Sequence, residues 1–86
     1  MQLPDRRPEI EYPALWSYQV IGTDEGLVRR AVGEVVLERA HTLKLTKTSR
    51  TGKYCSLLLE VTVVDEAERL ALFEALAAHA DVRIVL

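Results

Sequence analysis

Residues 49–56 are the part of this chain whose side chains best suit the binding of an anion. They read Ser-Arg-Thr-Gly-Lys-Tyr-Cys-Ser, and no acidic residue occurs between positions 42 and 54. Gly52 can take the positive φ that a tight turn often needs, so we call this segment the basic hairpin. Cations grouped around such a turn attract phosphates, carboxylates or an acidic partner. The candidate binding residues are Lys44, Lys47, Arg50, Gly52, Lys53 and Tyr54.

Two interpretations of the basic hairpin are open. It is either a local site for an anion or a partner, or an edge hairpin whose cations keep it soluble, which is a common feature of sheet edges. A second turn, residues 22–27, leads backbone N–H groups into a predicted helix, as many anion sites do. Asp24 and Glu25 would repel an anion there, so we interpret that turn as a helix cap.

The remaining reactive side chains form no recognisable metal or catalytic set. His41 and His79 are isolated in the sequence, whereas a metal site needs three or four ligands. Cys55 alternates with apolar residues and is expected to be buried, with no histidine or acid placed to activate it. We therefore predict no metal, no cofactor and no catalytic residue. Three aromatic residues are interpreted as core rather than as a cofactor site: Trp16, Tyr18 and Phe73.

Four segments alternate as β-strands do. They are residues 14–21, 42–48, 54–63 and 82–86. The third segment has a wholly apolar row on one face, which is typical of a central strand. The second carries charges and threonines, which are typical of an edge strand, with Leu43 and Leu45 inward. We place Val85 of the last segment on the open face of the sheet. The inward residues of the first segment are Ala14, Trp16, Tyr18 and Val20.

Two segments between the strands have helical spacing. Residues 25–40 repeat apolar side chains at intervals of three and four, and Gly33 at their centre would permit close packing. A second helix is predicted from about residue 65 to residue 79, beginning with a capping-box-like Asp-Glu-Ala-Glu. The expected core positions are Val28, Ala31, Val32, Val35 and Val36 in the first helix and Leu72, Phe73 and Leu76 in the second.

The order strand, helix, strand, strand, helix, strand predicts an α+β fold. Each helix is long enough to be a right-handed crossover between two strands. The result is a ferredoxin-like βαββαβ plait, a four-stranded antiparallel sheet of order 4-1-3-2 with both helices on one face. We divide the chain into a flexible lead-in, residues 1–11, and a single domain, residues 12–86.

Composition narrows the classes of function. The 86 residues carry a net charge of −2, so no overall basic field attracts nucleic acid or a membrane surface. We find no signal-peptide pattern and no apolar run long enough to span a membrane. The single cysteine cannot form an intrachain disulfide, which fits a reducing compartment. We therefore expect a cytoplasmic protein without a membrane partner.

Comparison with other proteins of this topology favours a role other than catalysis. Acylphosphatase-like enzymes use an arginine in the first strand–helix turn and an asparagine, but this turn has no arginine and the chain has no asparagine. RNA-binding domains of this topology expose stacking aromatics on the central strands, where only Tyr54 is available. Metallochaperones need a Cys-x-x-Cys motif, which is absent. Nucleic-acid binding through the basic hairpin and a small ferredoxin-fold enzyme stay as the less favoured alternatives.

We predict instead a regulatory or interaction module that binds a small ligand or a protein partner. The open sheet face is expected to mix apolar and polar side chains, and a half-apolar exposed face invites a partner or a second copy. A homodimer through the open sheet face or through an edge strand is the corresponding hypothesis. The apolar residues expected on that face are Leu15, Ile21, Leu58 and Val85.

Separated segments of the chain resemble the UPF0250 or YbeD-like family of uncharacterised small bacterial proteins. Residues 12–22 resemble its aromatic-Pro strand, and residues 72–76 and 81–86 fit its second helix and closing strand. The residues that match its hairpin are Ser49, Gly52, Tyr54 and Ser56. Arg50 and Thr51 replace the Ser-Lys of the family pattern, so the positive charge is moved along the hairpin. The resemblance covers residues 12–86 and implies an ACT-like ferredoxin fold with a regulatory role.

Overall fold

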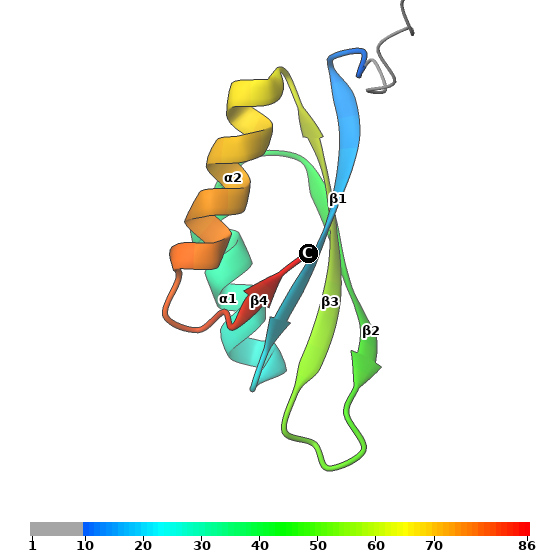
Figure 1. Ribbon diagram of the computed structural model, residues 1–86, viewed down its shortest axis with the longest axis vertical. Helices are drawn as coiled ribbons and strands as arrows, with labels where there is room; N and C mark the ends of the chain where they lie inside the picture. Colours follow the sequence, from blue (N-terminus) through cyan, green and yellow to red (C-terminus); the bar gives the residue numbers. More distant parts are fainter. Residues whose placement is uncertain (1–9) are drawn as a thin grey trace, which may run out of the picture.

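The computed structural model describes residues 10–86 and has the predicted order of elements (Figure 1). The elements are β1 (Ala14–Gly22), α1 (Glu25–Val36), β2 (His41–Thr48), β3 (Cys55–Val63), α2 (Glu66–Ala78) and β4 (Ile84–Val85). The strands are antiparallel in the order β2-β3-β1-β4, and both helices cover one face of the sheet. The ferredoxin-like plait is therefore confirmed. Most of the predicted lead-in, residues 1–9, lies outside the described residues.

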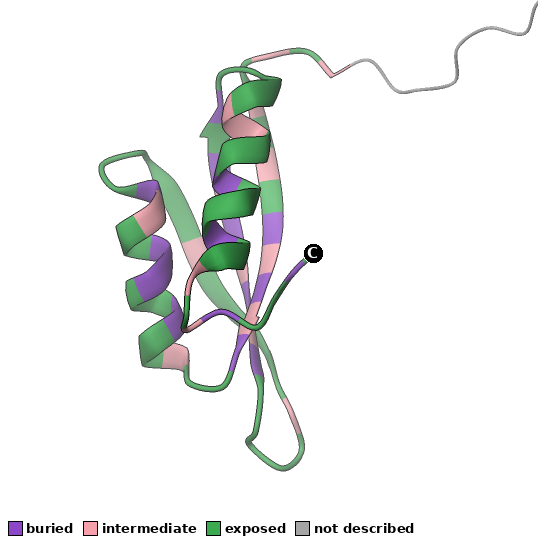
Figure 2. Cartoon of the chain, turned by 60° about the vertical axis from the view of Figure 1, so that its left-hand side comes forward, coloured by how far each residue is buried: buried purple, intermediate pink, exposed green. Residues whose placement is uncertain are grey.

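The two central strands, β1 and β3, hold the core together. They pair along their whole length, from Ala14 opposite Val63 to Gly22 opposite Cys55. Because side chains alternate along a strand, one row of each strand faces the helices and is buried. Figure 2 shows this buried layer on both strands and on parts of both helices. The predicted apolar row of β3 is confirmed: Cys55, Leu57, Leu59, Val61 and Val63 are all buried.

Both helices begin at an aspartate cap. The side chain of Asp24 accepts a hydrogen bond from the N–H of Leu27 at 2.9 Å, and that of Asp65 accepts one from Glu68 at 2.8 Å. Each bond satisfies one N–H that the helix itself leaves free. The interpretation of residues 22–27 as a helix cap therefore agrees with the structure. No helix within residues 10–86 combines the length and the apolar character needed to cross a membrane.

The first helix is shorter than predicted. It ends at Val36 rather than near residue 40, because Leu37 adopts a positive φ of 55° and its N–H bonds the carbonyl of Gly33 at 3.0 Å. The apolar spacing continues past this point and so gave no sign of the ending. Val35, which we expected in the core, is only half-buried.

Glycine serves close packing at Gly22 and not at Gly33. A Cβ built on Gly22 would lie 2.4 Å from Cγ2 of Val28 and 2.8 Å from the carbonyl oxygen of Asp81. The end of β1 can therefore approach α1 and the segment before β4 only without a side chain. Gly33 is exposed, and nothing lies within 4 Å of its hypothetical Cβ, so our expectation for it was wrong.

The side chains of the last strand point to the opposite sides of the sheet from those predicted. Val85 lies opposite Val20 and is buried, whereas Ile84 lies opposite Ile21 and is half exposed. Alternation counted back from Val85 would expose residues 82 and 84, yet Val82 is also buried, because regular pairing starts only at Ile84. The open face therefore carries Ile84 in place of Val85.

Two further residues that we expected in the core are exposed. Phe73 is 40% exposed, although Leu72 and Leu76 on the same helix are buried. Leu45 is 39% exposed, because β2 is an edge strand and a register shift follows at Lys47. Both positions satisfied the local pattern but lie where the neighbouring element does not cover them.

Candidate functional site

The tip of the basic hairpin is shaped by Ser49 and Gly52. The carbonyl of Ser49 accepts the N–H of Gly52 at 2.9 Å, and the N–H of Ser49 bonds the carbonyl of Tyr54 at 2.8 Å. The hydroxyl of Ser49 also accepts the N–H of Tyr54 at 3.0 Å. Gly52 has a φ of 71°, which a residue without Cβ adopts at little cost. The predicted role of Gly52 in the turn geometry is confirmed.

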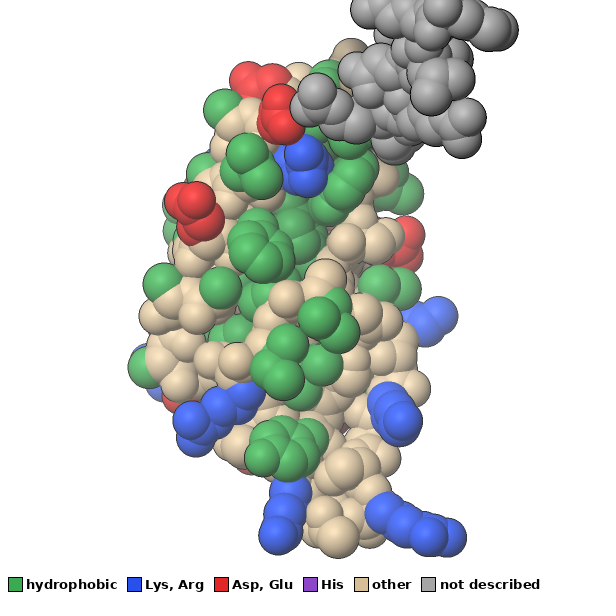
Figure 3. All heavy atoms as spheres, in the orientation of Figure 1, with side chains coloured by type: hydrophobic (Ala, Val, Ile, Leu, Met, Phe, Trp, Pro, Cys, Tyr) green, Lys and Arg blue, Asp and Glu red, His purple; other side chains and the backbone are tan. Residues whose placement is uncertain are grey.

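Four exposed cations occupy this end of the molecule. Lys44 and Lys47 lie opposite Leu58 and Ser56 and so share the open face of the sheet. Arg50 and Lys53 belong to the loop itself. No ion pair joins any of the four to an acidic side chain within residues 10–86. Figure 3 shows cationic side chains at the hairpin end and acidic ones near the start of α2, at the other end.

A shallow hollow of about 180 Å³ lies beside the hairpin. Lys47 and Tyr54 meet at its wall, together with Ile21 from β1. Tyr54 is 51% exposed and precedes β3, which begins one residue later than predicted. Of the six predicted site residues, the structure thus brings Lys47 and Tyr54 to one hollow. Gly52 shapes the turn. Lys44, Arg50 and Lys53 do not line the hollow.

The middle of the open sheet face is polar. Gln19 Oε1 accepts the hydroxyl of Ser56 at 2.7 Å and lies 3.5 Å from the hydroxyl of Thr46. These bonds link β1, β3 and β2 on the uncovered side of the sheet. Leu15 is 65% exposed on the same face, so the face combines a bonded polar centre with apolar side chains at its margins.

The thiol of Cys55 is unsuited to nucleophilic chemistry. The side chain is buried on the helix side of β3, as predicted. Burial raises the pKa of the thiol, and the nearby carboxylates of Glu25 and Asp24 raise this pKa further. A thiol that stays protonated is a poor nucleophile. Within residues 10–86, no three histidine, cysteine or acidic side chains are grouped in a way that could hold a metal ion.

His79 is not isolated, which corrects our interpretation of the two histidines. Its Nδ1 accepts the N–H of Asp81 at 3.1 Å, so its Nε2 carries the proton and donates to Glu34 Oε2 at 2.6 Å. This bond joins the end of α2 to α1. It lowers the pKa of the Glu34 carboxyl, because it stabilises the charged form. Glu34 and His79 are 45 positions apart, so no local sequence pattern predicted this hydrogen bond.

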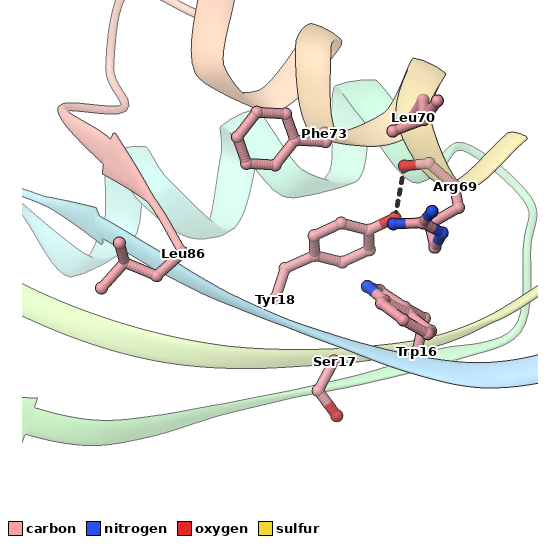
Figure 4. A pocket seen from close by; sticks show the side chains of 7 residues that line it. All are labelled: Trp16, Ser17, Tyr18, Arg69, Leu70, Phe73 and Leu86. Atoms are coloured by element: carbon pink, nitrogen blue, oxygen red, sulfur yellow. Dashed lines mark hydrogen bonds between the residues drawn. The ribbon is translucent and has the colours of Figure 1, made fainter. Parts of the chain in front are cut away.

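A larger hollow, of about 420 Å³, lies between β1 and α2 (Figure 4). We call it the β1–α2 groove. Figure 4 shows the rings of Tyr18 and Phe73 across it, and the guanidinium group of Arg69 beside Trp16. We had interpreted all three aromatics as core, but only Tyr18 is fully so. The groove is lined by Trp16, Ser17, Tyr18, Arg69, Leu70, Phe73 and Leu86.

Arg69 is held at one end of this groove by three contacts. Its guanidinium carbon lies 4.7 Å from the centroid of the Trp16 ring, and its Nε donates to the hydroxyl of Tyr12 at 3.1 Å. The bond to Tyr12 raises the pKa of Arg69, so the group is a permanent cation. Its Nη2 also reaches Glu66 at 3.3 Å. Tyr12 and Arg69 are 57 positions apart, so no local sequence pattern predicted their contact.

The sheet order and the two helices on one face define a ferredoxin-like α+β domain. Over residues 7–86 the chain matches the family model described as "Protein of unknown function (DUF493)", so it belongs to that family. This is the UPF0250 or YbeD-like family that its residues resemble.

Two relatives are described as uncharacterised proteins, and one solved structure has a similar fold. An uncharacterised protein of Campylobacter jejuni is 35% identical over 75 residues, covering 87% of this chain and 86% of its own. One from Helicobacter pylori J99 is 33% identical over 72 residues, covering 83% of both chains. The solution structure of HP0495 from H. pylori is similar, with a TM-score of 0.82 at 27% identity, over 100% of this chain and 97% of that one.

Proposed function

We propose that this domain is a non-enzymatic interaction module that binds an acidic segment of a protein partner through the basic hairpin. The observation that carries the proposal is the group of four exposed cations that form no ion pair with an acidic side chain within residues 10–86. A cation with no ion-pair partner within residues 10–86 can pair with a carboxylate brought by another molecule. Such pairs guide association and fix orientation.

The placement of these charges supports the same role. The turn at Gly52 extends the cations beyond the body of the sheet, and the acidic start of α2 lies at the other end of the molecule (Figure 3). The acidic start of α2 is therefore too far from the hairpin to repel an acidic segment bound there. The hollow beside Tyr54 offers space for one side chain of that segment or for a small ligand.

The chemistry of the remaining groups supports binding rather than catalysis. Cys55 is buried with a raised pKa, and His79 is engaged with Glu34. The free thiol fits a reducing compartment, so we propose that the module acts in the cytoplasm. The implied ACT-like fold extends the proposal to regulation, in which occupancy of the hairpin controls a partner.

Fluorescence anisotropy with a labelled nine-residue peptide of Asp, Glu and Ser tests the proposal. The variant Lys47→Ala with Arg50→Ala should bind about five- to thirty-fold more weakly, because each exposed ion pair contributes about 0.5–1 kcal/mol. The matched control, Arg30→Ala with Arg39→Ala, changes net charge equally, at α1 and beside Glu68 near the start of α2, and should bind as the wild type does. Equal loss in both variants, or no binding by the wild type, would reject the hairpin as the site.

The same assay distinguishes a nucleic-acid ligand from an acidic peptide ligand. A labelled twelve-nucleotide oligouridine should bind more weakly than the peptide, since only Tyr54 offers an exposed ring at the hairpin. Tighter binding of the RNA, with a steep dependence on salt and loss in the hairpin variant, would replace the protein partner by single-stranded nucleic acid.

A homodimer through the open sheet face is the second candidate. The exposed side chains of Leu15 and Ile84 on this face favour it. Sedimentation equilibrium should then show a dimer at high micromolar concentration that Leu15→Asp converts to a monomer. A wild type that sediments as a monomer at millimolar concentration excludes this arrangement.

A further inference from the structure

Among residues 10–86, no strand covers the edge of β1 beside the β1–α2 groove. Gln19 exchanges two backbone hydrogen bonds with Leu86, both of 2.9 Å, and the carbonyl of Ile21 accepts the N–H of Arg83 at 2.8 Å. Along a strand the backbone groups of alternate residues point to the same side, so those of Ser17 and Leu15 also point away from β3. No backbone hydrogen bond within residues 10–86 reaches them on that side.

The open edge and the groove lie side by side. β4 covers only Val20 and Ile21 of β1, and the groove begins where this cover ends, at Leu86. Trp16 and Tyr18 direct their side chains to the helix side and form one wall, and Phe73 of α2 forms the other (Figure 4). Phe73 is 40% and Leu70 is 45% exposed, so both present uncovered apolar surface there.

We propose that this edge binds a short extended segment of a partner polypeptide, which adds to the sheet beside β1 in line with β4. Unpaired backbone donors and acceptors next to an apolar groove are the two features that a strand-adding peptide recognises. The backbone groups of Ser17 bond the peptide main chain, and the groove receives its side chains. This site is distinct from the basic hairpin and does not depend on the function proposed for it.

The register of β4 determines what the peptide must carry. The pair Gln19–Leu86 exchanges two hydrogen bonds, so the next such pair on this edge is at Ser17, two residues away. The peptide residues opposite Tyr18 and Trp16 then face the helices and enter the groove. Those two positions, separated by one residue, require apolar side chains.

Arg69 adds a charge preference at one end. It lies over Trp16, and its Nη1 makes no hydrogen bond within residues 10–86. A peptide that runs antiparallel to β1 reaches this guanidinium after its second apolar residue. Because side chains alternate along a strand, the peptide residue opposite Leu15 faces the open side of the sheet, and the one opposite Ala14 faces the helix side, where Arg69 lies. The segment we propose is therefore apolar-x-apolar-x followed by an aspartate or glutamate, whose carboxylate is an ordinary partner of arginine.

A partner segment fits this edge better than a second copy of the domain does. In the symmetric register that pairs Ser17 of one copy with Leu15 of the other, Pro13 falls opposite Gln19. Leu86 of the other copy already lies there, so the two chains would overlap. A peptide of five residues that begins opposite Tyr18 avoids this conflict.

A phage-displayed library of random ten-residue peptides tests the proposal, selected on the wild type and counter-selected on Ser17→Pro. Proline removes the N–H of Ser17, which points to the open edge, and leaves the pairing with β3 intact. Selected peptides should carry the apolar-x-apolar-x-acid pattern. A synthetic copy should bind Ser17→Ala as it binds the wild type, but bind Ser17→Pro at least tenfold more weakly.

Two further measurements make the outcome decisive. In the unmodified protein, the same peptide should slow hydrogen exchange at the amides of Leu15 and Ser17 at least tenfold, which requires no folded proline variant. The hairpin variant Lys47→Ala with Arg50→Ala should bind this peptide with the same affinity as the wild type. The proposal is wrong if peptides are enriched no more on the wild type than on Ser17→Pro, or if the peptide leaves the amides of Leu15 and Ser17 unprotected. Self-association that rises with concentration and depends on Ser17 would also overturn it, in favour of a second copy of the domain.

Discussion

The guanidinium carbon of Arg69 lies 4.7 Å from the centroid of the Trp16 ring. This contact ties α2 to the half of β1 that β4 leaves uncovered, and it closes one end of the β1–α2 groove. Trp16 is the single tryptophan of the chain, so its fluorescence reports on this position directly.

Replacement of Arg69 by methionine should lower the urea midpoint and shift the emission of Trp16. The methionine keeps an apolar stem but removes the cation over the ring and the donor to Tyr12. Arg30→Met is the matched control, since the Arg30 side chain is 75% exposed on α1. Equal midpoints for the two variants would mean that the Arg69 contacts add nothing to stability.

Replacement of Tyr18 by phenylalanine should destabilise the fold by about 1 kcal/mol. The hydroxyl of Tyr18 donates to the carbonyl of Arg69 at 2.7 Å in a side chain that is only 2% exposed. Burial raises the pKa of this phenol, so it stays a donor at neutral pH. Tyr54→Phe removes the same group from an exposed ring and should change the free energy of unfolding by less than about 0.5 kcal/mol. Urea denaturation compares the two, and equal losses would contradict the role of the bond.

Alanine should have opposite effects at Gly22 and Gly33. At Gly22 the new methyl group would overlap Val28 and the Asp81 carbonyl, which should cost about 1–3 kcal/mol. At Gly33 the methyl group meets open space within a helix, so alanine should stabilise the protein by about 0.5–1 kcal/mol. Thermal denaturation of both variants measures the difference. A neutral Gly22→Ala would show that α1 can move away from the end of β1.

Stability should fall in acid through Glu34. The pKa of its carboxyl is lowered from 4.5 by the hydrogen bond to His79. A group with a lowered pKa in the folded state stabilises the fold above its unfolded pKa, and this contribution is lost as the pH falls through the folded value. Glu34→Gln should therefore flatten the decline in the urea midpoint below about pH 4.5, the ordinary pKa of a glutamate carboxyl. The exposed Glu74→Gln should leave it unchanged, and parallel curves for both variants would contradict this linkage.

Much of the fold could be predicted because its main elements are locally patterned. The apolar row from Cys55 to Val63 identified a central strand, and the charged strand before it identified an edge. Asp24 and Asp65 identified both helix starts. Errors arose where the structure does not follow from the local pattern. Leu37 ends α1 because it adopts a positive φ, and the side chain of Val85 is buried because it pairs with Val20.

The two candidate sites differ in the same way. The basic hairpin is one continuous segment, so its cations, its glycine and its aromatic ring could all be read from neighbouring positions. The groove could not, because Tyr18 and Arg69 are 51 residues apart and no local pattern relates them. Phe73 has the spacing of a core residue and is nonetheless exposed on the groove wall.

The amino-acid sequence by itself determined the plait, the central and edge strands and the charged tip of the hairpin. These follow from side-chain periods of two and of three to four, from caps and from a turn glycine, all of which act over a few residues. Only the tertiary structure decided that β4 covers two residues of β1 and that no other strand within residues 10–86 pairs with the edge at Ser17 and Leu15, beside Trp16 and Arg69. That outcome depends on how separately formed elements pack together, and the packing is set by shape and volume rather than by any local period.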